Sequence, residues 1–182
     1  MPTFWKRLLI AAVALALVGL GVMRFMKIQT KKASPEEVVT FFVDGAEIAV
    51  DYSRPYKKGR DIFGGLVPYG TVWRTGANEA TTFSVNKDIT FGKTPVKAGT
   101  YTLWTLPGLE CWEVYLNNKM YGWGVDMDGV AQRDPLADVA KVTVQPQLTD
   151  TLVEQFTINV EGDPTALILQ WDMTRVEVPI EL

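Results

Sequence analysis

An uncharged apolar run near the N-terminus limits this chain more than any other feature. Residues 8–23 read LLIAAVALALVGLGVM and contain no charged side chain. Sixteen residues rise about 24 Å as an α-helix, and apolar residues on both sides extend the run from Phe4 to Met26. That length approaches the ~30 Å hydrocarbon core of a bilayer. The sequence therefore predicts a membrane helix within residues 4–26.

A cleaved signal peptide is the alternative to an uncleaved anchor. The small-residue pair in Ala14-Leu15-Ala16 lies inside the apolar run, and Arg24 and Lys27 occupy the region where a small, polar cleavage site would stand. We therefore favour an uncleaved signal anchor over residues 1–29. A polar linker over residues 30–37 and a folded domain over residues 38–182 would follow it.

The remainder of the chain consists of short strand-like runs separated by turns. Ser34-Pro35-Glu36-Glu37 is expected to cap one short helical turn. The strand-like runs are 47–52, 82–86, 100–106, 112–117, 139–144, 156–160, 166–171 and 176–180. Runs at this spacing, without a helical apolar stripe, predict an all-β antiparallel β-sandwich, jelly-roll-like or immunoglobulin-like, behind one N-terminal transmembrane helix.

The composition excludes several classes of function. Residues 1–32 carry six basic and no acidic side chains, whereas the rest carries 12 basic and 21 acidic ones. Such an acidic domain is not expected to bind nucleic acid. The absence of histidine excludes an imidazole base and imidazole metal ligands. Cys111 is the only cysteine, so no intrachain disulfide is possible, and we interpret it as a small buried hydrophobic residue.

Two loop motifs call for a functional interpretation. Asp126-Met127-Asp128-Gly129 resembles a calcium loop only in part, because Val130 and the missing closing glutamate break the EF-hand spacing. We therefore expect a solvated turn there, and neither a metal nor another cofactor in the domain. Tyr121-Gly122-Trp123-Gly124 is either a stacking platform or ordinary loop packing, since glycines beside aromatic residues leave rings at a surface.

The segment 51–82 carries the clearest functional hint. Between residues 51 and 74, five basic residues stand against two acids, in a domain that is otherwise acidic. Its three arginines are expected to form a cationic pocket for carboxylate or phosphate, since guanidinium groups bind such ligands bidentately. Two aromatic side chains would supply flat walls, and an Asn-Glu pair further polar contacts. The candidate ligand-binding residues are Tyr52, Arg54, Arg60, Trp73, Arg74, Asn78 and Glu79.

Two alternatives to this site remain open. In the first, an arginine pairs with Glu79 or Asp61 and pins long loops across the sandwich, while Trp73 belongs to the core. In the second, Glu79 acts with Asp61 or Asp51 as the carboxyl pair of a hydrolase, which would need the two groups ~5–9 Å apart. Sequence spacing does not show such convergence, so no catalytic residue is assigned and a non-catalytic domain is expected.

Several motifs resemble those of one bacterial family. They are YSRPYKKGR at 52–60, IFGGLVPYG at 62–70, WRTGANEAT at 73–81 and AGTYTLWTLP at 98–107. Over residues 35–182 the chain resembles the family called domain of unknown function 2911, found in cell envelopes. The resemblance implies a small β-sandwich behind a signal or anchor segment. It implies no reaction, because the family has no settled activity.

The charges beside the apolar run leave its orientation open. Lys6 and Arg7 favour a cytoplasmic N-terminus, but four basic residues after the run outnumber them and would invert the chain. Because the resemblance implies an envelope domain, we expect a single-pass protein of a bacterial inner membrane with a periplasmic domain. Its expected function is to bind a small anionic or glycan-like envelope ligand. The alternative is a protein–protein interaction module or an accessory subunit of a membrane complex.

Overall fold

The computed structural model describes residues 2–182, which fall into two compact units that meet between Ala33 and Ser34. The N-terminal unit is helix α1, Thr3–Ala33, which has no buried side chain and a mean hydropathy of 2.4 over its most apolar window. Its 31 residues would span about 46 Å. The chain therefore has a helix long and apolar enough to cross a membrane, which fits a single-pass membrane protein.

Helix α1 continues through residues that were expected to begin a linker. Thr30, Lys31 and Lys32 lie within the helix, and lysine is a good helix former. Lys31 and Lys32 also occupy the last turn, where positive charge complements the helix dipole. The predicted linker over residues 30–37 is thus divided between the end of α1 and the start of the next unit.

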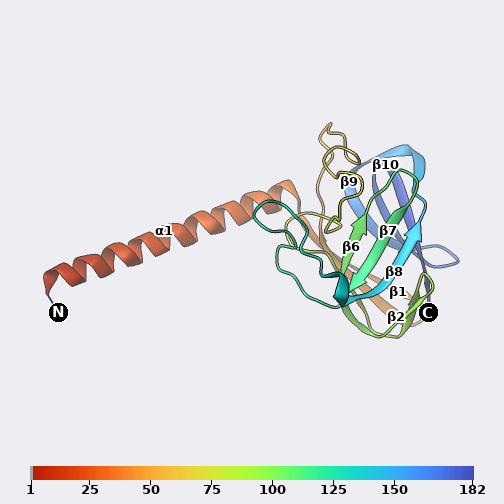
Figure 1. Ribbon diagram of the computed structural model, residues 1–182, viewed down its shortest axis with the longest axis horizontal. Coiled ribbons are helices and arrows are strands. Elements are labelled where there is room, and N and C mark those ends of the chain that lie inside the picture. Colours follow the sequence, from red (N-terminus) through yellow and green to blue (C-terminus); the bar gives the residue numbers. More distant parts are fainter. Residues whose placement is uncertain (1) are drawn as a thin grey trace. The chain divides into compact units, whose positions relative to one another are not determined.

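The second unit is a sandwich of two antiparallel sheets. The first sheet contains, in spatial order, β1 (Glu36–Val43), β2 (Ala46–Ser53), β3 (Thr82–Val85), β6 (Gly99–Leu106), β7 (Trp112–Asn117) and β8 (Asp138–Val144). The second contains β5 (Thr94–Val96), β4 (Ile89–Phe91), β10 (Ala166–Glu181) and β9 (Gln147–Glu161). A short 3-10 turn, Pro135–Ala137, precedes β8. Figure 1 shows the blue β9–β10 pair as a second layer behind the green β6 and β7. The predicted β-sandwich with an N-terminal apolar helix is confirmed.

The core lies between the two sheets and includes residues from the long loop between β2 and β3. Alternation along β2 points Ile48, Val50 and Tyr52 inward, each almost fully buried. From the loop, Trp73 stacks on Trp171 of β10, with ring centroids 6.0 Å apart and planes at 19°. Burial of such large aromatic surfaces holds the loop onto the sandwich. Trp73 therefore belongs to the core, as the structural alternative expected.

The sequence-based prediction is wrong for the segment that enters the sandwich. Ser34-Pro35-Glu36-Glu37 does not cap a helical turn, because β1 begins at Glu36 and pairs with β2 from Glu36↔Ser53 to Val43↔Ala46 without a break. The β-branched and aromatic residues of residues 38–43 favour a strand and outweigh the local capping pattern. The predicted runs 166–171 and 176–180 are parts of one strand, β10, whose register shifts on both sides of Asp172.

Cys111 is exposed, contrary to the expectation that it is a small buried residue. It lies in the turn between β6 and β7, one residue before β7 begins at Trp112. The strand-like run around it misled the prediction, because the strand and its buried residues start only at Trp112.

Candidate functional site

Arg54 joins three strands through its guanidinium. Its Nε donates to the carbonyl of Phe156 at 3.0 Å, and its Nη2 donates to Thr157 Oγ1 at 2.8 Å, both on β9. Its Nη1 forms an ion pair with Glu37 of β1. Arg54 therefore pins the end of β2 across the sandwich, with Glu37 as the acidic partner in place of Glu79 or Asp61.

Tyr52 and the residues after it cover the free side of β9. The Tyr52 hydroxyl accepts a hydrogen bond from the Ile158 N–H at 3.0 Å, and burial raises the pKa of this phenol. The carbonyl of Pro55 accepts from the Phe156 N–H at 2.9 Å, and the Lys57 N–H donates to the Glu154 carbonyl at 2.7 Å. The segment 52–57 thus supplies hydrogen-bond partners to backbone groups of β9, which is an edge strand.

Arg60 and Arg74 form hydrogen bonds with parts of the domain that Arg54 does not contact. Arg60 is exposed and donates to the carbonyls of Lys57 and Tyr56, so it closes its own loop. Arg74 donates from Nη1 to the carbonyl of Trp123 at 2.9 Å. Burial lowers the pKa of Arg74, and the negative charge of Glu79 opposes that shift. The three arginines are therefore bound to different parts of the domain.

Asn78 is a buried turn residue. It is 6% exposed and has a φ of 58°, in the left-handed region that asparagine tolerates better than most residues. Its Nδ2 lies 3.2 Å from the carbonyl of Ser34 and 3.4 Å from the hydroxyl of Ser53. Asn78 therefore fastens the start of the sandwich to the end of β2.

A cavity of about 220 Å³ lies over the ends of β1, β2 and β3 on the outer side of the six-stranded sheet. Its lining residues are Glu36, Asp51, Tyr52, Ser53, Glu79, Ala80, Thr82, Tyr121 and Gly122. Pairing of Glu36 with Ser53 and of Asp51 with Thr82 brings residues from three strands to one place. Tyr52 and Glu79 are the two predicted site residues that line this cavity.

Tyr121 supplies an aromatic wall of the cavity, and contacts with neighbouring residues hold its ring in place. Its ring packs edge-on against Trp104, with centroids 5.1 Å apart, and its hydroxyl accepts from the Asp134 N–H at 2.8 Å. The following Gly122 accepts from the Ala80 N–H at 3.1 Å. Gly124 has a φ of 77°, and a Cβ there would lie 3.0 Å from that of Ala80. The loop 118–134 therefore packs closely on the loop that carries Glu79, and of its two aromatic residues Trp123 is the exposed one.

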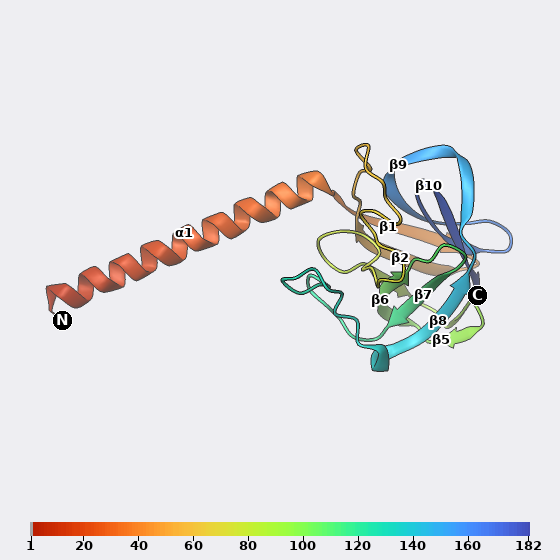
Figure 2. The same ribbon diagram turned by 45° about the horizontal axis from the view of Figure 1, so that its top comes forward.

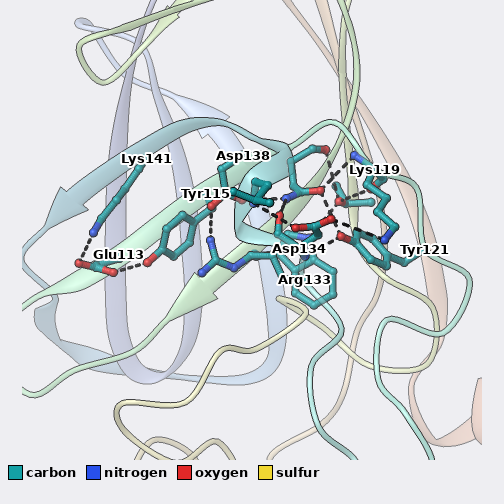
Figure 3. Close-up of polar contacts among 12 residues, drawn as sticks. Glu113, Tyr115, Lys119, Tyr121, Arg133, Asp134, Asp138 and Lys141 are labelled. Atoms are coloured by element: carbon teal, nitrogen blue, oxygen red, sulfur yellow. Dashed lines mark hydrogen bonds and ion pairs between the residues drawn. The ribbon is translucent and has the colours of Figure 1, made fainter.

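A polar network ties the same loop to β7 and β8 (Figure 3). The Arg133 guanidinium lies 3.8 Å from the ring centroid of Tyr115 and forms an ion pair with Asp138. The Tyr115 hydroxyl donates to Glu113, which also accepts from Lys141 at 2.6 Å. Burial and then this bond to Glu113 raise the pKa of Tyr115 to about 12. The hydrogen bond from Lys141, followed by that from Tyr115, lowers the pKa of Glu113.

Sequence analysis missed this network because its members meet only through strand register. Glu113 and Lys141 are 28 positions apart, and the β7–β8 pairing that places Tyr115 opposite Lys141 brings them together. No motif marks them. The alternation of polar and apolar residues along β7 and β8 is the only signal, and it gives no partner without the register.

The family model described as Protein of unknown function (DUF2911) matches residues 34–180. The chain belongs to this family. The match begins at the first residue of the second unit, so the DUF2911 domain corresponds to the β-sandwich and α1 lies before it. No curated protein matches the chain, and no solved structure matches it either.

The cavity gives the DUF2911 domain a site of acidic character. Glu36, Asp51 and Glu79 supply carboxylates, and Ser53 and Thr82 supply hydroxyl groups. Within the described residues 2–182, no three acidic or cysteine side chains lie in an arrangement that would hold a metal ion. In the turn at residues 126–130, the Asp126 carboxylate accepts from the N–H groups of Asp128 and Val130. The cavity offers hydrogen-bond acceptors beside an aromatic ring.

Proposed function

We propose that this chain is a single-pass protein of a bacterial inner membrane whose DUF2911 domain stands in the periplasm and binds a small glycan-like ligand without altering it. Helix α1 supports the membrane anchor, since it is long and apolar enough to span a bilayer. The observation that carries the binding function is the cavity between Asp51, Glu79 and Tyr121.

The lining of the cavity determines the class of ligand. Carboxylates accept hydrogen bonds from sugar hydroxyls, and an aromatic side chain offers a flat apolar face to a sugar ring. An ammonium group on the ligand would gain further from the negative charge, whereas a carboxylate or phosphate would be repelled. The proposed ligand is therefore a neutral sugar or an amino sugar, in place of the anionic ligand that was expected from the arginines. A cavity of about 220 Å³ suits a ligand of about one sugar ring.

Thermal unfolding of the full chain in detergent tests this function with three matched sugars. Glucose, glucosamine and glucuronate share a ring and differ in carrying a hydroxyl, an ammonium or a carboxylate group. At 100 times its dissociation constant a ligand adds about 2.7 kcal/mol of stability. We expect stabilisation in the order glucosamine, glucose, glucuronate, with glucuronate giving none.

Matched variants then locate the effect. Asp51→Asn removes one carboxylate of the cavity, and the control Asp150→Asn removes an exposed carboxylate on β9. The proposal requires Asp51→Asn to lose the stabilisation by glucosamine and Asp150→Asn to keep it. Equal stabilisation of both variants, or stabilisation by glucuronate alone, would contradict it.

A glycoside hydrolase is the second candidate, because Glu79 and Asp51 line the same cavity. Asp61, the other partner considered, is absent from that lining. A hydrolase would release a coloured leaving group from aryl glycosides, and Glu79→Gln would abolish that turnover while Asp61→Asn would not. We expect no turnover by the unaltered chain. Turnover that depends on Glu79 would establish the hydrolase in place of the binding domain.

A further inference from the structure

Two outer strands, β9 and β1, differ in whether another segment bonds to their free edge. On β9, one of the two outer strands of the four-stranded sheet, backbone groups of Glu154, Phe156 and Ile158 are bonded by the segment 52–57. On β1, one of the two outer strands of the six-stranded sheet, residues 38–43 pair with β2 on one side. In the part of the chain that the structure describes, residues 2–182, no hydrogen bond joins residues 38–43 to any other segment.

The sequence of β1 lacks the features that usually protect such an edge. Residues 38–43 read VVTFFV, with no charge, proline or glycine, and their pairing with β2 contains no bulge. Side chains on the outer face remain accessible, since Val38 is 63% and Phe42 is 77% exposed. An uninterrupted apolar edge of this kind is a template for pairing with another strand. In Figure 2, β1 belongs to the orange strand pair.

The residues of β1 are complementary to themselves when the strand is reversed. An antiparallel pairing centred on Thr40 would place Val38 opposite Phe42 of a second copy on the outer face, and Val39 opposite Phe41 on the inner face. Pairs of β-branched and aromatic residues are among the favourable cross-strand neighbours. The acidic residue Glu36 would lie at the rim, four positions from the centre.

We infer that β1 is a self-association interface, in which two copies of this chain pair antiparallel about Thr40 and join their six-stranded sheets. Such a pairing has two-fold symmetry and uses the same surface on both copies. Confinement of both copies to one membrane by α1 raises their effective concentration, so a modest interface suffices. The interface borders the cavity at Asp51 and Glu79, since Glu36 lines that cavity and would lie at the rim of the interface.

Cysteine cross-linking of the full chain in lipid nanodiscs or native membranes tests the register. In a Cys111→Ser background, Thr40→Cys places two thiols opposite each other across the symmetry axis, within the Cα spacing that a disulfide requires. Ser84→Cys, on β3 of the same sheet, is the matched control. We expect a cross-linked dimer as the main oxidised product of Thr40→Cys and not of Ser84→Cys. Equal cross-linking of the two variants would overturn the inference.

A charge placed on the outer face of β1 separates this interface from association through α1. Phe42→Lys alters an exposed side chain and should leave the fold intact, as should the control Leu148→Lys, whose leucine on β9 is 89% exposed. Because the dimer would contain the Val38–Phe42 pair twice, we expect Phe42→Lys to weaken self-association about tenfold. Leu148→Lys should not change it. A chain that is monomeric in the membrane, or a dimer unaffected by Phe42→Lys, contradicts the inference.

Discussion

The hydroxyl of Tyr52 lies 3.0 Å from the backbone nitrogen of Ile158 and accepts its hydrogen bond. This contact joins an inner residue of the six-stranded sheet to the outer strand of the other sheet, and it gives a buried N–H group its partner. Tyr52, which was expected to form a wall of a ligand site, therefore helps to hold the two sheets together.

Loss of the Tyr52 hydroxyl should destabilise the sandwich. Tyr52→Phe keeps the ring packed against Phe156 but leaves the Ile158 N–H without its acceptor. A buried donor without a partner costs about 1–3 kcal/mol. Chemical denaturation followed by tryptophan fluorescence should show that loss, whereas Tyr69→Phe, at a tyrosine that is 40% exposed, should change little. Equal effects of the two variants would show that the contact does not stabilise the fold.

Arg54 should be more important to stability than its charge alone suggests. Arg54→Lys keeps a positive charge near Glu37 but removes the planar group that reaches both Phe156 and Thr157. We expect a loss of about 1–2 kcal/mol in the free energy of unfolding. The matched change Arg60→Lys, at a side chain that donates to the carbonyls of Lys57 and Tyr56 in its own loop, should cost less than half as much. A lysine at position 54 that is tolerated as well as one at position 60 would contradict the bracing role.

Tyr115 should make the domain sensitive to alkaline pH. Its folded pKa of about 12 lies above the ordinary 10.0, so the neutral hydroxyl stabilises the fold fully below pH 10. That stabilisation is lost as the pH rises through about 12, by about 2 kcal/mol over this window. Because burial also raises the pKa of Tyr52, ultraviolet absorbance of tyrosinate should show one late-titrating group fewer in Tyr115→Phe than in the unaltered chain. An unchanged number of late-titrating groups in the variant would contradict the assignment to Tyr115.

Glu113 should contribute to stability on the acid side. The bonds from Lys141 and Tyr115 lower its pKa from the ordinary 4.5, so the folded state gains stability above pH 4.5 and loses it as the pH falls through the lower folded pKa. Because Lys141 is half-exposed, we expect the effect to be about 0.5 kcal/mol. Denaturation curves at neutral and acid pH should show a smaller pH dependence for Glu113→Gln than for the control Glu110→Gln, at an exposed turn position.

Local patterns predicted the helix and most of the strands but could not predict the site. An apolar run suffices to identify α1, and alternation suffices for β2, β6 and β7. The role of Arg54 depends on Phe156, which lies 102 positions away, and the meeting of Asp51 with Glu79 depends on how the loop 54–81 folds back. The basic character of that loop suggested an anion site, because sequence alone does not show that its arginines are occupied by carbonyl groups.

The most direct test of the proposed function is to map where glucosamine binds, using backbone amide NMR signals of the isotopically labelled full chain in detergent. If the cavity is the site, signals of Ala80 and Gly122 should shift with one saturable dissociation constant, and those of Arg60 should not move. Shifts confined to Arg54, Arg60 and Arg74, or no saturable shift at any amide, would contradict the assignment of the cavity as a glycan-binding site.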